Sequence, residues 1–159
     1  MDDILSEENN MTQWRYAVIA ALTACCVTLF GDSAWAQIGQ IKNVAGQVSL
    51  SRNNLQQPAK TGDLIEPTDV LITGPDGSIG ITFIDNTRLS AGPNSRIELK
   101  QFRFNPTTQE GEFLTDVQHG TLAIISGQIA KRSPDAMKVK TPTTILGVRG
   151  TTFVVKVDE

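Results

Sequence analysis

The part of the sequence after Ala36 holds few side chains that could carry out catalysis. Both cysteines lie before that point, and His119 is the one histidine in the chain. His119 follows Val117–Gln118 and precedes Gly120, a pattern typical of a strand end that enters a turn, and no serine or aspartate forms a catalytic partner motif with it. We therefore interpret His119 as a structural or solvated residue and predict that the protein is not an enzyme.

Three aspartates, Asp63, Asp76 and Asp85, stand in segments with turn composition. They could bind calcium, but no acidic loop has the alternating ligand pattern of a calcium site. A short carboxylate in a turn more often accepts hydrogen bonds from the turn backbone, and we favour that interpretation. A pair of glycosidase carboxylates stays open, because the sequence does not give distances in space. We predict no metal site and no cofactor.

Arg149 lies in a glycine-rich segment, between Gly147 and Gly150. Glycines allow close backbone approach and a guanidinium offers a rigid fork of donors, so we interpret Arg149 as a structural clamp on carbonyls or a buried carboxylate. A contact with a partner is the alternative. A basic strip could form from Lys131, Arg132, Lys138 and Lys140. Such a strip is more often the solvated face or the guarded edge of a sheet.

The segments that must position these residues alternate apolar and polar side chains. Examples are Ile79, Ile81 and Phe83, Leu122 and Ile124, and Phe153, Val155 and Val157. This period of two is typical of strands with one buried face, and no long stretch has helical spacing. We therefore predict an all-β fold, a compact short-stranded β-sandwich or a short β-solenoid, with almost no helix after Ala36.

Turn chemistry separates the predicted strands. Glycine, proline, aspartate and asparagine cluster at Thr61–Gly62–Asp63, Gly74–Pro75–Asp76–Gly77, Asp85–Asn86–Thr87 and Gly92–Pro93–Asn94. Asn86 is expected at positive φ in a tight hairpin turn, since asparagine tolerates that region better than most residues. The apolar alternation changes parity between Leu99 and Phe102, which predicts a β-bulge.

The first 36 residues have the pattern of a secretory signal helix. Arg15 precedes an apolar run over residues 16–30, and Ala34 and Ala36 supply the small residues of a cleavage site. The run is shorter than the roughly 20 residues that a permanent membrane span needs. We predict cleavage before Gln37. Acidic residues follow Met1, whereas a start at Met11 would give the signal its usual basic beginning.

A second cleavage site competes with the first. Leu22–Thr23–Ala24–Cys25 resembles a bacterial lipobox, so a lipid anchor on Cys25 is the alternative. Apolar residues follow Cys25, where a polar tether is usual. We therefore favour soluble export to the periplasm or the extracellular space.

Cleavage before Gln37 leaves one domain, residues 37–159, with a nearly neutral charge. Lysine plus arginine falls from 14 to 13 and aspartate plus glutamate from 17 to 12, which changes the net charge from −3 to +1. A neutral domain has no strong attraction to nucleic acid, so no nucleic-acid partner is predicted. Both cysteines fall in the signal, and burial alone must stabilise the domain.

The order of these motifs resembles the FecR-like domain, the periplasmic part of iron-transport signalling regulators. The resemblance runs from about Val44 to Val157. It is carried by Gly46–Gln47–Val48, Thr61–Gly62–Asp63, residues 69–74, residues 81–89, Gly92–Pro93–Asn94–Ser95, Gly120–Thr121–Leu122 and Thr141–Pro142 through Gly147–Val148–Arg149–Gly150–Thr151. Asn86 stands where the family usually has glycine.

The resemblance implies a non-catalytic interaction or signalling module that binds a protein or a component of the cell envelope. It implies structural roles for the family-motif residues Gly62, Asp63, Asp85, Asn86, Gly147, Arg149, Gly150 and Thr151. Full regulators of this type carry a cytosolic domain and a membrane span that this sequence does not show. The alternative is therefore the periplasmic part of a split sigma-factor and transporter system for iron signalling. An envelope carbohydrate hydrolase is the remote alternative.

Overall fold

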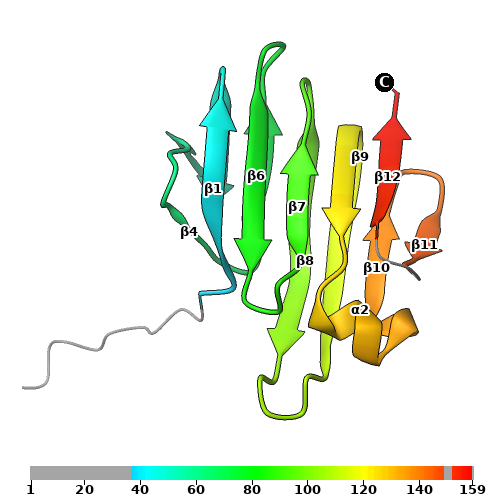
Figure 1. Ribbon diagram of the computed structural model, residues 1–159. Coiled ribbons are helices and arrows are strands. Elements are labelled where there is room, and N and C mark those ends of the chain that lie inside the picture. Colours follow the sequence, from blue (N-terminus) through cyan, green and yellow to red (C-terminus); the bar gives the residue numbers. More distant parts are fainter. Residues whose placement is uncertain (1–36, 149–151, 159) are drawn as a thin grey trace, which may run out of the picture. The chain divides into compact units, whose positions relative to one another are not determined.

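The computed structural model describes residues 37–148 and 152–158, which form an all-β domain (Figure 1). The fold class predicted from the alternation is confirmed. The predicted signal helix, with Ala34 and Ala36, lies outside the described residues, as do Arg149, Gly150 and Thr151. Expectations about these positions stay predictions.

The strands form two layers that share one long strand, β9 (Gly111–Ile125). The front layer in Figure 1 has the order β4-β1-β6-β7-β9-β12, with β1 Gly39–Ala45, β4 Leu64–Ile65, β6 Ser78–Phe83, β7 Arg88–Ala91 and β12 Thr152–Val157. The back layer has the order β3-β2-β5-β8-β9-β10-β11, with β2 Val48–Arg52, β3 Leu55–Pro58, β5 Val70–Thr73, β8 Arg96–Phe104, β10 Met137–Lys140 and β11 Ile145–Gly147. Neighbouring strands are antiparallel except β9 and β10, which are parallel.

The strand β9 passes from the back layer to the front layer at Gly120. Residues 111–119 pair with β8 and β10, and residues 120–125 pair with β7 and β12. Gly120 has a φ of +93°, which turns the strand over the end of the domain. A Cβ atom at this position would lie 2.2 Å from Ser95 Oγ and 2.4 Å from Ser95 Cα. Glycine is therefore required both for the dihedral angle and for the close approach.

We expect Gly120→Ala to lower the free energy of unfolding by about 2 kcal/mol or more, because alanine adds both strain and a clash. Gly62→Ala is the matched control, since Gly62 has a φ of +98° but nothing within 4 Å of the added Cβ. That variant should lose only about 1 kcal/mol, the cost of the dihedral angle. Urea denaturation of the two variants measures the difference. Equal losses of unfolding free energy would show that an added Cβ at position 120 does not clash with Ser95.

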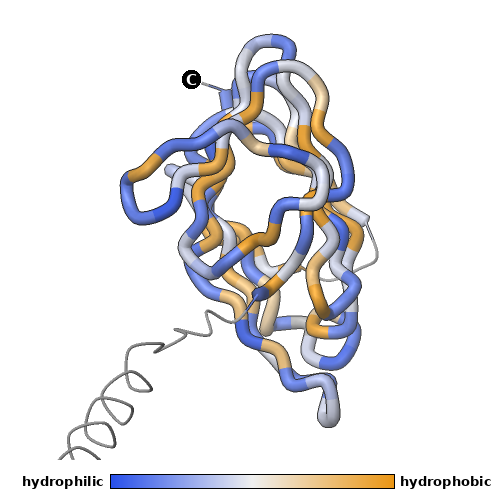
Figure 2. Tube along the Cα trace, turned by 90° about the vertical axis from the view of Figure 1, so that its left-hand side faces the viewer, coloured by the Kyte–Doolittle hydropathy of each residue, from blue (hydrophilic) through white to orange (hydrophobic). Residues whose placement is uncertain are grey.

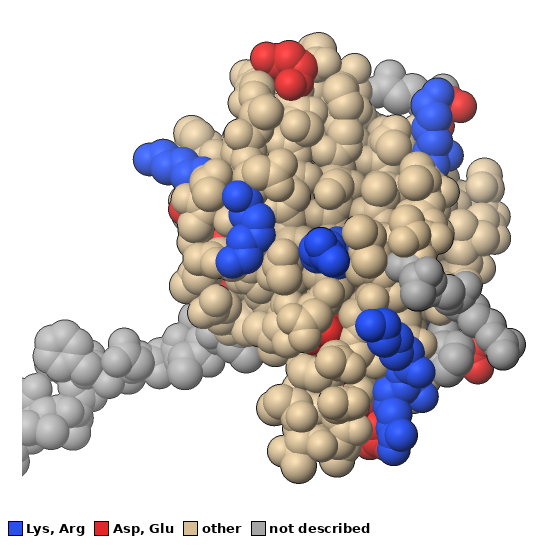
Figure 3. Space-filling model, in the orientation of Figure 1, with Lys and Arg blue, Asp and Glu red and all other residues tan. Residues whose placement is uncertain are grey.

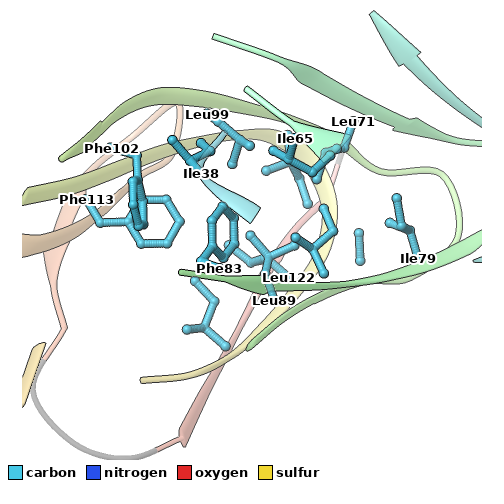
Figure 4. Packing of buried hydrophobic residues seen from close by; sticks show 14 of the residues in the cluster. Ile38, Ile65, Leu71, Ile79, Phe83, Leu89, Leu99, Phe102, Phe113 and Leu122 are labelled. Carbon is cyan, nitrogen blue, oxygen red and sulfur yellow. The ribbon is translucent and has the colours of Figure 1, made fainter. Parts of the chain in front are cut away.

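The core lies between the two layers. Seen from the side, the chain runs in two walls that curl toward each other, with apolar positions alternating along both (Figure 2). Three rings, Phe83, Phe102 and Phe113, pack together with centroids 4.8–5.3 Å apart (Figure 4). They come from β6, β8 and β9, so this contact joins the two layers.

The predicted β-bulge in β8 is confirmed. The pairing of β8 with β9 shifts register between Leu99 and Gln101, and both Leu99 and Phe102 are buried. The extra residue turns two side chains of opposite parity toward the same core.

Two short helices follow β9, namely α2 (Gln128–Arg132) and a 3₁₀ turn at Pro134–Ala136. The five residues of α2 are too few for an apolar period to be visible in the sequence, yet Ile129 and Ala130 are buried. Across residues 37–148 and 152–158, no helix is long and apolar enough to cross a membrane.

Candidate functional site

The three turn aspartates accept hydrogen bonds from the backbone. Lys60 N–H donates to Asp63 Oδ2 at 2.8 Å, Gln47 N–H to Asp76 Oδ1 at 3.2 Å, and Thr87 N–H to Asp85 Oδ1 at 3.0 Å. The described residues contain no group of three or more histidine, cysteine, aspartate or glutamate side chains arranged to hold a metal ion. The aspartates thus lie apart, each within its own turn.

Asp85 also connects its hairpin turn to α2. Its Oδ2 accepts from Thr87 Oγ1 at 2.7 Å and from Ile129 N–H at 3.4 Å, and Thr87 Oγ1 accepts from Gly127 N–H at 3.0 Å. The side chains of Asp85 and Thr87 are fully buried. Buried polar groups satisfied in this way hold the segment after β9 against the turn between β6 and β7.

Asn86 has a φ of +66°, as the sequence predicts. We expect Asn86→Gly to be neutral or mildly stabilising, whereas Asn86→Val should cost about 1 kcal/mol or more, because a β-branched residue is strained at positive φ. Ser90→Val is the control, since Ser90 is exposed in the extended strand β7, where valine is favourable. Thermal unfolding compares them, and an unchanged Asn86→Val midpoint would contradict the turn geometry.

His119 lies at the β9 corner. Its Nδ1 is 2.8 Å from the carbonyl oxygen of Asn94, and a carbonyl only accepts, so Nδ1 carries the proton. The same turn is held by Ser95, whose Oγ donates to Gly92 O at 2.8 Å and accepts from Thr121 N–H at 3.0 Å. The histidine therefore contributes to a network that fastens the turn at residues 92–95 to the corner.

Arg52 forms a cluster that no pattern in the sequence indicated. Its Nε and Nη2 donate to the two oxygens of Asp69, each at 2.8 Å, its Nη1 to Glu66 Oε1 at 2.6 Å, and its Nη2 also to Leu64 O at 3.0 Å. The hydrogen bond with Asp69 is the main cause that raises the pKa of the Arg52 guanidinium above its ordinary value, against the effect of its own burial. Asp69 is 0% exposed. This cluster joins β2 in the back layer to β4 in the front layer.

Paired carboxylates occur on the outer face of the back layer. Glu98 on β8 is in register with Asp116 on β9, which is in register with Lys140 on β10. Lys140 Nζ lies 3.1 Å from Asp116 Oδ2, and Lys100 Nζ lies 2.7 Å from Glu98 Oε2. Each of these two carboxylates thus forms an ion pair with a lysine, and both ion pairs lie on the outer face of the sheet.

The four basic residues proposed as a strip do not share one strand face. Lys131 and Arg132 are in the last turn of α2, while Lys138 and Lys140 are exposed on β10. In the view of Figure 3, cations lie apart from one another over the strands of the front layer, and a longer group of cationic side chains lies at the lower right, where Figure 1 places α2.

Apolar side chains remain exposed at the margin formed by β11 and β12. Ile145 is 61% exposed, Leu146 40% and Val154 65%. Phe153, Val155 and Val157 face the core from β12 but are only half-buried. We call these six residues the β11–β12 margin. Surface leucine or valine is ordinary when single, but several exposed or half-buried apolar residues on two edge strands mark a candidate interaction site, even though Ile145 and Val154 face outward and the other four face the core.

The fold and its motifs define an all-β domain built around structural turns. The family model described as "FecR protein" matches residues 69–159, more than half of the chain. The chain belongs to the FecR family. Two motifs that resemble the FecR-like domain, Gly46–Gln47–Val48 and Thr61–Gly62–Asp63, precede the residues matched by the family model.

One solved structure shows a partial likeness. It is described as "Cell surface anchoring domain", is 35% identical to this chain, and has a TM-score of 0.38; the match covers 39% of this chain and 83% of that one. The search of curated proteins found no match.

Proposed function

We propose that the protein is a non-catalytic, exported module of the cell envelope that binds another protein. The observation that carries the proposal is the contrast between polar side chains bonded within the domain and apolar side chains left uncovered at its margin. The turn aspartates, Arg52 and His119 hold the domain together, while the apolar residues of the β11–β12 margin stay exposed or half-buried. Membership in the FecR family supports the same class of function.

A protein suits this margin better than an envelope polymer. A strand edge offers backbone donors and acceptors, and flanking apolar side chains add specificity for alternate residues of an extended chain. No described phenylalanine offers a fully exposed ring to a polymer, because all of them lie in the core or half-buried against it, namely Phe83, Phe102, Phe104, Phe113 and Phe153. Family membership also favours a signalling form of the proposal, in which the partner is a separately encoded transporter or regulator.

Export is the part of the proposal that can be measured first. The intact mass of the exported protein is expected to correspond to a chain beginning at Gln37, because Ala34 and Ala36 form a cleavage site after an apolar run. A diacylated chain beginning at Cys25 would instead place the domain on a membrane surface.

The binding function is tested by cross-linking in intact cells. A lysine-reactive reagent is expected to join the exported chain to one defined envelope protein. The control is the same chain without residues 1–36, which remains inside the cell and should not form that adduct. If the exported chain forms no specific adduct, and the purified protein degrades envelope glycan, the proposal is wrong and the hydrolase alternative replaces it.

A further inference from the structure

The two layers do not have equal numbers of strands on both sides of β9. On one side, the described strands number four in each layer, β7-β6-β1-β4 in front and β8-β5-β2-β3 behind. On the other side, the front layer has β12 alone, whereas the back layer has β10 and then β11. Figure 1 shows β11 extending beyond β12. Among the described strands, the front layer therefore has one strand fewer than the back layer at this margin.

The inward face of β11 is apolar at the position left uncovered. Leu146 is in register with Val139, which is fully buried, so both side chains face the front layer. Val139 is covered, but Leu146 is 40% exposed. On β12, the core-facing residues Phe153, Val155 and Val157 are likewise half-covered. A strand placed beside β12 would cover both sets of side chains.

We propose that this vacant position accepts one extended segment of a partner protein, which adds a strand to β12 and packs against Leu146. The inference rests on the proposed binding function and specifies how that binding occurs. The inserted segment needs apolar residues at every second position, because alternate side chains of a strand face the same side. Its backbone would form hydrogen bonds with the N–H and C=O groups on the outer edge of β12. Within residues 37–148 and 152–158, the one strand that is hydrogen-bonded to β12 is β9.

A second copy of this domain does not fit the position. In a symmetric edge-to-edge pair, the β12 strands of both copies would lie side by side in one sheet. The back layer is one strand wider, so β11 of one copy would occupy the place of β10 in the other. A single extended segment has no second layer and avoids this collision.

The opposite margin also ends in two edge strands, β3 and β4, but there a cluster of side chains joins the two layers. There Arg52 on β2 donates to Leu64 O on β4 and forms ion pairs with Glu66 and Asp69. The numbers of strands in the two layers match, and the guanidinium joins the layers. Leu55 on β3 is 75% exposed at this margin and provides a control position where the two layers have equal numbers of strands.

The test uses a synthetic peptide with the sequence of residues 152–158 as a single strand. Paired antiparallel with β12 and centred on Val155, it would place its Phe153 opposite Val157, with all apolar residues of that parity facing inward. Saturable binding to the exported protein is expected, followed by fluorescence anisotropy, together with slower hydrogen exchange of the β12 amides. The same peptide with Val155→Pro should not bind, because proline removes a donor and disrupts the strand.

Two protein variants locate the site. Leu146→Ser is expected to weaken peptide binding about fivefold, since it removes part of the apolar surface that the peptide covers. Leu55→Ser, the same change at the opposite margin, should leave binding unchanged. Absence of binding, equal binding to the Leu146→Ser variant, or exchange protection on β3 instead of β12 would overturn strand addition. If any of these results occurs while cross-linking in cells still yields a specific partner, only the binding mode is wrong and the proposed function stands.

Discussion

Replacing Arg52 with alanine is expected to lower the free energy of unfolding by about 3 kcal/mol. The change leaves Asp69 fully buried with neither of its two guanidinium hydrogen bonds, and it releases the link from β2 to β4. A buried charge that loses its partner costs much more than an exposed ion pair contributes. Chemical denaturation of the purified protein measures the loss.

Two further variants show whether geometry or charge is responsible. Arg52→Lys keeps the charge but loses the planar fork, so an intermediate loss is expected. Arg96→Ala is the matched control, because Arg96 lies in the same layer and donates to Gln118 Oε1 in an exposed pair. It should change stability by about 0.5 kcal/mol or less. If the Arg52 and Arg96 variants unfold alike, the cluster does not join the layers.

The effect of Arg52 should not depend on pH in the neutral range. Hydrogen bonding to Asp69 raises the pKa of Arg52, and a group with a raised pKa contributes its full stability at any pH below its ordinary pKa, which for arginine lies far above neutral. The contribution is lost only as the pH rises through the raised pKa. The difference between the Arg52→Ala variant and the parent should therefore be the same at neutral and mildly alkaline pH.

Asp85→Ala is expected to cost about 3 kcal/mol, since hydrogen bonds to a buried carboxylate are among the stronger ones. The variant leaves the Thr87 N–H and hydroxyl without their acceptor and removes the contact to Ile129 N–H. Both the hairpin turn and the start of α2 should loosen. Hydrogen exchange should therefore accelerate in residues 127–132 as well as in the turn.

The matched control for Asp85 is another turn aspartate. Asp76 is exposed and accepts one backbone hydrogen bond, at 3.2 Å from Gln47 N–H. Asp76→Ala should cost less than about 1 kcal/mol, because water can solvate the exposed N–H group. A loss at Asp85 no larger than that at Asp76 would show that Asp85 does not connect the hairpin to α2.

Local features of this fold could be predicted from the sequence. The alternation in β6 and β12, the bulge between Leu99 and Phe102, and the positive φ of Asn86 all follow from residue type and short spacing. The sequence also left the choice between sandwich and solenoid open, because strand order depends on contacts distant in the chain.

Distant contacts account for what the sequence did not predict. Arg52 and Asp69 are 17 residues apart, with Arg52 on β2 and Asp69 directly before β5, so no local pattern marks them as a pair. A charged residue directly before the apolar residues 70–72 was the available signal. Similarly, His119–Gly120 was expected to be a turn between strands, whereas Gly120 is a corner within one strand, since both halves of β9 find partners.

The candidate binding margin could not be found from the sequence either. The alternation of Phe153, Val155 and Val157 is the same as that of a strand covered on both edges. What distinguishes β12 is that its neighbours in the two layers are unequal in number, and this is a property of the topology. Exposure of Leu146 and Val154 becomes visible only once the strands are paired.

The most direct test places a photoreactive amino acid at single positions of the exported chain in intact cells. Val154 at the β11–β12 margin and Leu55 at the opposite margin are both exposed, at 65% and 75%, so both sites are accessible. We predict that the Val154 position cross-links to one envelope protein and that the Leu55 position does not. Cross-links from Leu55 alone, or from neither position, would contradict binding through this margin.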